Sequence, residues 1–159
     1  MKLISQTFYA LVALCLLSAC TSEESTEIDT LANLETTIEV ENNIELAEEV
    51  LDVLNDYRAT LGLNALQWHT DSENLAVGHS SYMVAQNAAS HDNFYERAAI
   101  LQENGADMVS ENVAYGFRDA ESVLEGWLNS PAHKQAIEGD YTHSGIGIVL
   151  TETGIPYYT

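Results

Sequence analysis

The stretch Gly126-Trp127-Leu128-Asn129-Ser130-Pro131-Ala132-His133 decides how the last third of the chain folds. An apolar helical run ends in this stretch, and a second helix begins directly after it. Ser130 is a favourable N-cap because its hydroxyl can accept a backbone N–H of the next turn, and Pro131 follows where a helix needs no donor. The chain is therefore expected to turn sharply, with the indole of Trp127 on one side and the imidazole of His133 on the other.

Helical periodicity dominates the sequence before this corner. Apolar residues recur at three- and four-residue intervals over residues 45–61, and Gly62 supplies a C-terminal cap. Thr70 and Glu73 have the spacing of a capping box for a second helix. His79 lies on the apolar face of that helix, so we expect it to be a buried core histidine.

Two further helix starts and a pair of strands complete the pattern. Asn93 and Asp119 precede short helical runs and are suitable N-caps. Residues 145–150 and 155–158 read as paired strands about a turn, and Pro156 indicates an edge strand or the start of a strand. Helices followed by a terminal hairpin predict a mixed α+β domain.

The composition limits the classes of partner. The 159 residues include 25 Asp and Glu against 5 Lys and Arg, which gives a formal net charge of −20. A surface of this charge repels phosphate backbones and anionic lipid headgroups, so nucleic-acid binding is not expected. The length allows one domain with a substantial core, which we expect to be a monomer.

The N-terminus has the pattern of a bacterial lipoprotein. Residues 1–19 carry a short positive region and an apolar run too short to span a membrane, as a signal peptide does. Leu17-Ser18-Ala19-Cys20 resembles a lipobox, which implies a lipid on Cys20. Residues 20–43 are rich in acidic residues and contain no basic residue, which favours an acidic tether. We expect a chain lipid-anchored to the cell envelope, at the outer membrane if the cell has two membranes.

The chain from about Val50 onward resembles the CAP superfamily, which comprises cysteine-rich secretory proteins, antigen 5 and pathogenesis-related class 1 proteins. It is most similar to the bacterial SCP-like branch. The resemblance implies a three-layer α–β–α sandwich with a central antiparallel sheet, placed here at residues 44–159. It rests on a set of segments that come in the family's order: Leu54-Asn55-Asp56-Tyr57-Arg58, Leu66-Gln67-Trp68, Ser90-His91, Ser110-Glu111-Asn112-Val113-Ala114, the corner of residues 126–133, and Gly145-Ile146-Gly147.

The resemblance also implies a cleft that holds two His and two Glu in eukaryotic members. The first His and the first Glu map to His91 and Glu111. The second Glu falls at Ser130 in this chain, so the set of four is incomplete. The second His maps to His143, whereas His133 belongs to the bacterial Ser-Pro-x-His corner and is expected to enter the cleft from the other wall.

Imidazoles and a carboxylate are suitable ligands for a divalent ion such as zinc. The candidate metal ligands are therefore His91, Glu111, His133 and His143, and Glu111 and His91 are also the candidate catalytic residues. Trp127, Ser130 and Asn112 are expected to support the cleft. Structural alternatives remain open, because Glu111 could instead bind loop amides and His133 could brace Trp127.

Three functions follow from these residues. The first is an envelope module that binds a metal ion, a lipid or a peptide in the cleft. The second is a metal-dependent hydrolase that acts on a peptide or a lipid ester in the same cleft. The third is an interaction protein that uses its acidic surface. Since hydrolysis needs a free base besides a liganded ion, the serine at position 130 favours binding over catalysis.

Overall fold

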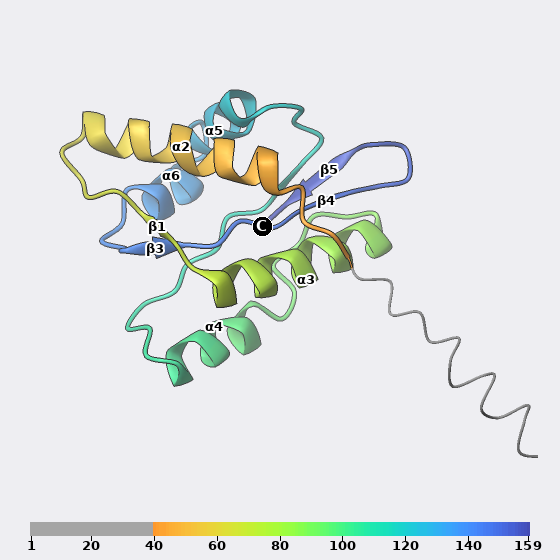
Figure 1. The fold of residues 1–159 in the computed structure, drawn as a ribbon, viewed down its shortest axis with the longest axis horizontal. Helices are drawn as coiled ribbons and strands as arrows, with labels where there is room; N and C mark the ends of the chain where they lie inside the picture. The colour runs from red at the N-terminus through yellow and green to blue at the C-terminus, as the bar shows by residue number, and fades with distance from the viewer. Residues whose placement is uncertain (1–39) are drawn as a thin grey trace, which may run out of the picture. The chain divides into compact units, whose positions relative to one another are not determined.

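A central sheet lies between two helical layers in residues 40–159, the part of the chain that the computed structural model describes (Figure 1). One layer contains α2, α5 and α6, and the other contains α3 and α4, so the predicted three-layer α–β–α arrangement is confirmed. The signal peptide, Cys20 and most of the predicted tether lie outside the described residues. The elements are α2 (Ile44–Thr60), β1 (Gln67–Trp68), α3 (Thr70–Gln86), α4 (Phe94–Glu103), β2 (Ala114–Tyr115), α5 (Ala120–Leu128), α6 (Pro131–Ile137), β3 (His143–Ser144), β4 (Ile148–Leu150) and β5 (Pro156–Tyr158).

The antiparallel sheet has the strand order β2-β5-β4. The predicted hairpin is confirmed, with Ile148 opposite Tyr158 and Leu150 opposite Pro156. Because β5 is the central strand, the edge-strand interpretation of Pro156 is wrong, and Pro156 instead begins its strand, where a missing N–H is tolerated. A short parallel pair, β1 with β3, accompanies this sheet and was not expected from the sequence.

Trp127 anchors the corner in the core between α2, α5 and the sheet. Its ring meets Tyr158 of β5 edge-on, at a centroid distance of 6.4 Å. Val50 and Val123 are fully buried beside it, together with Ile148 of β4. This layer therefore holds together through apolar burial, as the helical periodicity predicted.

Arg58, at the end of α2, is fully buried. Its Nη1 donates to the carbonyls of Ile137 at 2.6 Å and Gly139 at 3.0 Å, and its Nε donates to the carbonyl of Asn64 at 2.9 Å. Burial lowers the pKa of this guanidinium, and the carboxylate of Asp140 opposes that shift. Because these carbonyls compensate the buried charge, Arg58 joins the end of α2 to the end of α6.

The helices α4, α5 and α6 begin where the sequence predicted, but not all of the predicted capping hydrogen bonds are formed. Ser130 is the N-cap of α6, but its hydroxyl makes no capping hydrogen bond. Asp119 caps α5 as predicted, accepting from the backbone N of Ser122 at 2.8 Å. Asn93 precedes α4 in a left-handed conformation (φ 57°), and its side chain does not make the expected capping hydrogen bond.

The capping box predicted at Thr70 is wrong by one residue. The N-cap of α3 is His69, whose Nδ1 accepts from the backbone N of Ser72 at 3.3 Å. Glu73 has other partners, since its carboxylate accepts from the indole of Trp68 at 2.8 Å and from the amide of Asn42 at 2.9 Å. These contacts draw Glu73 away from the helix start, which explains the shift.

The predicted tether ends earlier than residue 43. The side chain of Asn42 accepts from the backbone N of Ile148 and donates to the carbonyl of Ile146. The backbone N of Asn43 donates to the carbonyl of Ile148 at 2.9 Å. Both asparagines are therefore bound along the edge of β4 and form part of the folded domain.

The Gly-Ile-Gly segment lies directly against the backbone of α3. A Cβ on Gly145 would collide with the backbone N of Glu73, and one on Gly147 would collide with the backbone N of Val77. The hydroxyl of Ser80 donates to the carbonyl of Gly147 at 2.8 Å across the same contact. Glycine is required here because the strand and the helix touch through their main chains.

Substitution of Gly147 by alanine should destabilise the domain. The added methyl group must displace the backbone of α3 or of the strand, which we expect to lower the free energy of unfolding by about 2–3 kcal/mol. Gly78→Ala on the same helix is the matched control, since its Cβ would meet no atom within 4 Å. The free energy of unfolding of that control should rise by up to about 1 kcal/mol, because alanine has a higher helix propensity than glycine. Urea unfolding measures both, and equal stability of the two variants would contradict the close approach.

Candidate functional site

Glu111 lies in the loop between α4 and β2, and two neighbouring elements hold this loop in place. The side chain of Asn112 donates to the carbonyl of His133 in α6 at 3.1 Å. The indole of Trp127 donates to the carbonyl of Val113 at 3.2 Å. The corner of residues 126–133 therefore fixes the residues directly after Glu111.

The carboxylate of Glu111 is the centre of the site. Its Oε1 lies 2.9 Å from Nδ1 of His91, and its Oε2 accepts from Nε and Nη2 of Arg97 at 2.9 and 2.6 Å. Only 9% of the Glu111 side chain is exposed. The structure thus brings two of the predicted site residues, His91 and Glu111, into direct contact.

This contact assigns the proton of His91. An ionised carboxylate can only accept hydrogen bonds, so Nδ1 of His91 must donate. In the neutral imidazole, Nε2 is then an acceptor, and 49% of the side chain is exposed. A carboxylate that orients an imidazole in this way is the arrangement that enzymes and metal sites use to fix a tautomer.

Arg97 is a site residue that the sequence reasoning missed. It lies in α4, and its Nη1 donates to the carbonyl of Asp92 at 2.8 Å while its other nitrogens bind Glu111. Only 14% of its side chain is exposed. One signal in the sequence was the scarcity of basic residues. Because the chain has only five Lys and Arg, a basic side chain within a helix is expected to pair with a carboxylate.

His79 is a buried core histidine, as predicted, with 3% of the residue exposed. Its Nε2 lies 2.8 Å from the carbonyl of Ser90, and its ring stacks on Tyr82. The same nitrogen lies 3.9 Å from Oε1 of Glu111, beyond hydrogen-bond distance. The Tyr82 hydroxyl donates to the carboxylate of Asp92, which raises the pKa of Tyr82. His79 therefore lines the back of the site without binding Glu111.

The two remaining predicted ligands, His133 and His143, lie in different places. The carbonyl of His133 accepts from the side chain of Asn112, so His133 lies beside the loop that carries Glu111. Burial lowers the pKa of His133, and the imidazole of His91 lowers it further. His143 instead lies next to His69, with ring centroids 5.7 Å apart, and its Nδ1 is 2.8 Å from the hydroxyl of Thr142. His133 thus lies beside the loop of Glu111, whereas His143 lies beside His69.

A cleft of about 810 Å³ adjoins this cluster. Glu111 and Arg97 line it at one place, and His69 and His143 line it at another. Ser130, at the position of the second acid, is not among the residues that line it. Of the four predicted ligands, Glu111 and His143 therefore line the cleft, whereas His91 and His133 do not.

Residues 51–159 match the family model described as the cysteine-rich secretory protein family, CAP. The chain belongs to the CAP family. An uncharacterized membrane protein of Bacillus subtilis is 36% identical over 106 residues, which are 64% of this chain and 31% of that protein. A secreted protein of Candida albicans is 30% identical over 97 residues, which are 61% of this chain and 20% of that protein. The chain thus spans less than a third of either curated relative.

Solved CAP-like structures share the fold. An extracellular protein of Bacillus anthracis with an SCP domain has a TM-score of 0.59 at 27% identity, over 74% of this chain and 40% of that one. An outer surface protein of Borrelia burgdorferi has a TM-score of 0.64 at 22% identity, over 72% of this chain and 88% of that one. The similar proteins thus include one named as secreted and one named as extracellular, and the outer surface protein shares the fold.

The residues of this CAP domain do not fit a zinc site as they are arranged. Across residues 40–159, no group of three or more His, Cys, Asp or Glu side chains converges in the way that an ion requires. The guanidinium of Arg97 covers one oxygen of Glu111, and the imidazole of His91 covers the other.

Proposed function

We propose that this CAP domain is a membrane-anchored binding module outside the cytoplasm, which takes its ligand in the cleft beside Glu111. The observation that carries this proposal is the open cleft of about 810 Å³ whose wall contains an oriented Glu111 and Arg97. Clefts of this volume with a few fixed polar groups are typical of small-ligand sites.

The lining favours a ligand with both an apolar and a polar part. Leu66, Leu75 and Leu101 contribute apolar surface, whereas Glu111 and His143 contribute polar groups. A lipid or an apolar peptide has this combination. Apolar contact supplies affinity in such sites, and the polar groups select the orientation.

Hydrolysis is the weaker alternative. A hydrolase needs a base that is free to take a proton, but both oxygens of Glu111 accept hydrogen bonds from neighbouring side chains. Position 130 offers a serine in place of the second acid. Binding needs neither group to change its protonation state.

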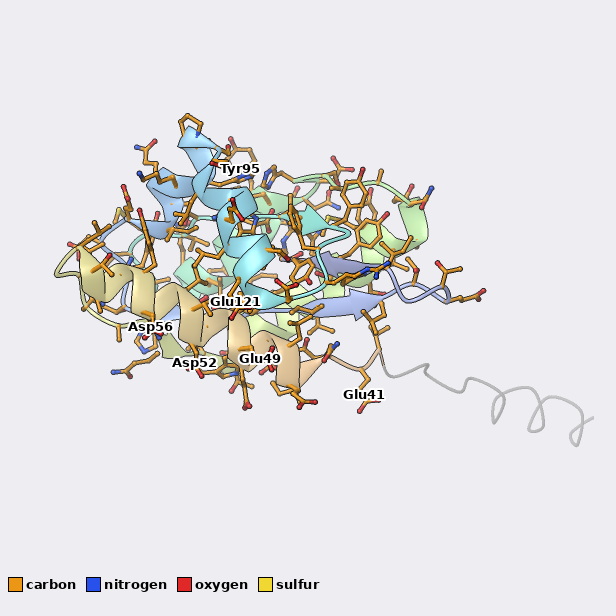
Figure 2. All side chains as sticks on the ribbon, turned by 90° about the horizontal axis from the view of Figure 1, so that it is seen from above. Glu41, Glu49, Asp52, Asp56, Tyr95 and Glu121 are labelled. Carbon is orange, nitrogen blue, oxygen red and sulfur yellow. The ribbon has the colours of Figure 1, made fainter. Side chains whose placement is uncertain are left out.

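The acidic surface offers a different site for a partner. Figure 2 shows Glu49, Asp52 and Asp56 directed away from the domain along α2, with Glu121 of α5 also at the surface. None of these four acidic residues is among those that line the cleft. Variants of the two surfaces can therefore separate the two functions.

A binding assay on the full chain tests the cleft. The probes are dansylated undecanoic acid and dansylated trileucine, read by fluorescence. Ala106 lines the cleft, so Ala106→Trp should fill it and weaken binding of at least one probe by about tenfold or more, equivalent to about 1.4 kcal/mol. The control is the triple variant Glu49→Gln, Asp52→Asn, Asp56→Asn, which should bind as the natural chain does. Absence of binding by both probes, or loss only in the triple variant, would refute the cleft proposal.

Anchoring through Cys20 forms part of the same proposal. The lipobox-like ending supports it, as do relatives named as membrane, secreted or outer surface proteins. Within residues 40–159, no helix has the length and apolar character that a membrane crossing requires. Cells fed a palmitate analogue should label the natural chain and leave Cys20→Ala unlabelled. Label that survives in the variant would exclude the anchor.

A further inference from the structure

The carboxylate of Glu111 already has a cation bound to it. Arg97 places two N–H groups on Oε2 at 2.9 and 2.6 Å, and His91 places one on Oε1 at 2.9 Å. With 9% of its side chain exposed, Glu111 has little surface left for another ligand. Charge-assisted hydrogen bonds of this kind are short and strong.

Arg97 is also held from its other side. Its Nη1 donates to the carbonyl of Asp92, and its backbone N donates to the carbonyl of Asn93, which begins the first turn of α4. A divalent ion that displaced the guanidinium would leave a largely buried positive charge without its carboxylate. Breaking a buried ion pair by removing one partner is costly, so displacement is disfavoured.

Without Arg97, the same place would offer an ion's ligands. Glu111 would present a free Oε2, and the imidazole of His91 lies 2.9 Å from the other oxygen, Oε1. With Arg97 present, the pair formed by Glu111 and Arg97 is neutral, and the guanidinium repels a dication. Arg97 therefore occupies the oxygen of Glu111 that an ion would otherwise bind.

We propose that Arg97 is a specificity-determining residue of the cleft, whose guanidinium takes the place of a cation on Glu111 and so excludes divalent metal. The site then offers a ligand the acceptor Nε2 of His91, which suits an uncharged hydroxyl or amide donor. That ligand preference rests on the proposed function, whereas the exclusion of metal does not.

The test is a calorimetric titration of the full chain with zinc. Arg97→Met removes the charge and keeps the apolar stem, so it should bind zinc at least about tenfold more tightly than the natural chain. Arg97→Lys keeps a cation and should resemble the natural chain. If Arg97→Met fails to fold, Arg97→Gln serves instead, because its amide can still donate to Glu111 without a charge.

A double variant tests whether the tighter zinc binding of Arg97→Met involves His91. Adding His91→Ala to Arg97→Met should abolish the tighter binding, since His91 would be a ligand. Equal zinc affinity in the natural chain and Arg97→Met, or a gain that survives His91→Ala, would overturn the proposal. Because the dansylated probes report on the cleft separately, failure of either proposal can be told from failure of the other.

Discussion

The ionised carboxylate of Glu111 joins three segments that are distant in the chain. It binds His91 after the end of α3, Arg97 in α4, and through its own loop the residues that lead into β2. The segments at His91 and Glu111 have irregular backbone, so secondary structure alone would not hold them against Arg97 of α4. The orientation of the imidazole and the position of the loop therefore depend on one buried charge and its partners.

The rest of the domain supplies a rigid frame for that contact. Trp127 packs on Tyr158 and donates to the loop, which links the core to the residues beside Glu111. Arg58 ties the end of α6 to α2, and α6 carries His133. The backbone contact between Gly147 and α3 fixes the helix from which His79 projects. A site on the surface is thus positioned by contacts that lie in the core.

The sequence predicted the regular parts of this structure well. Periodicity predicted the long helices, and the terminal strand pattern predicted the hairpin, because both depend on which residues are apolar. Cap chemistry was harder, since Glu73 binds Trp68 outside its own helix and Asn93 adopts a left-handed backbone conformation. The partners of Glu111 could not be fully predicted either. Arg97 comes 14 residues before Glu111 in another element, and no local pattern pairs them. Family resemblance named both His133 and His143, and only tertiary geometry separated them.

Nitrogen NMR of the His91 side chain tests most directly whether Glu111 organises the site. At about pH 8 a free imidazole is neutral and its two tautomers exchange. The hydrogen bond to Glu111 predicts a proton fixed on Nδ1 and a bare Nε2, with this preference lost in Glu111→Ala, which removes the acceptor. A proton on Nε2 in the natural chain, or the same averaged tautomers in the natural chain and the Glu111 variant, would contradict the claim that Glu111 organises the site.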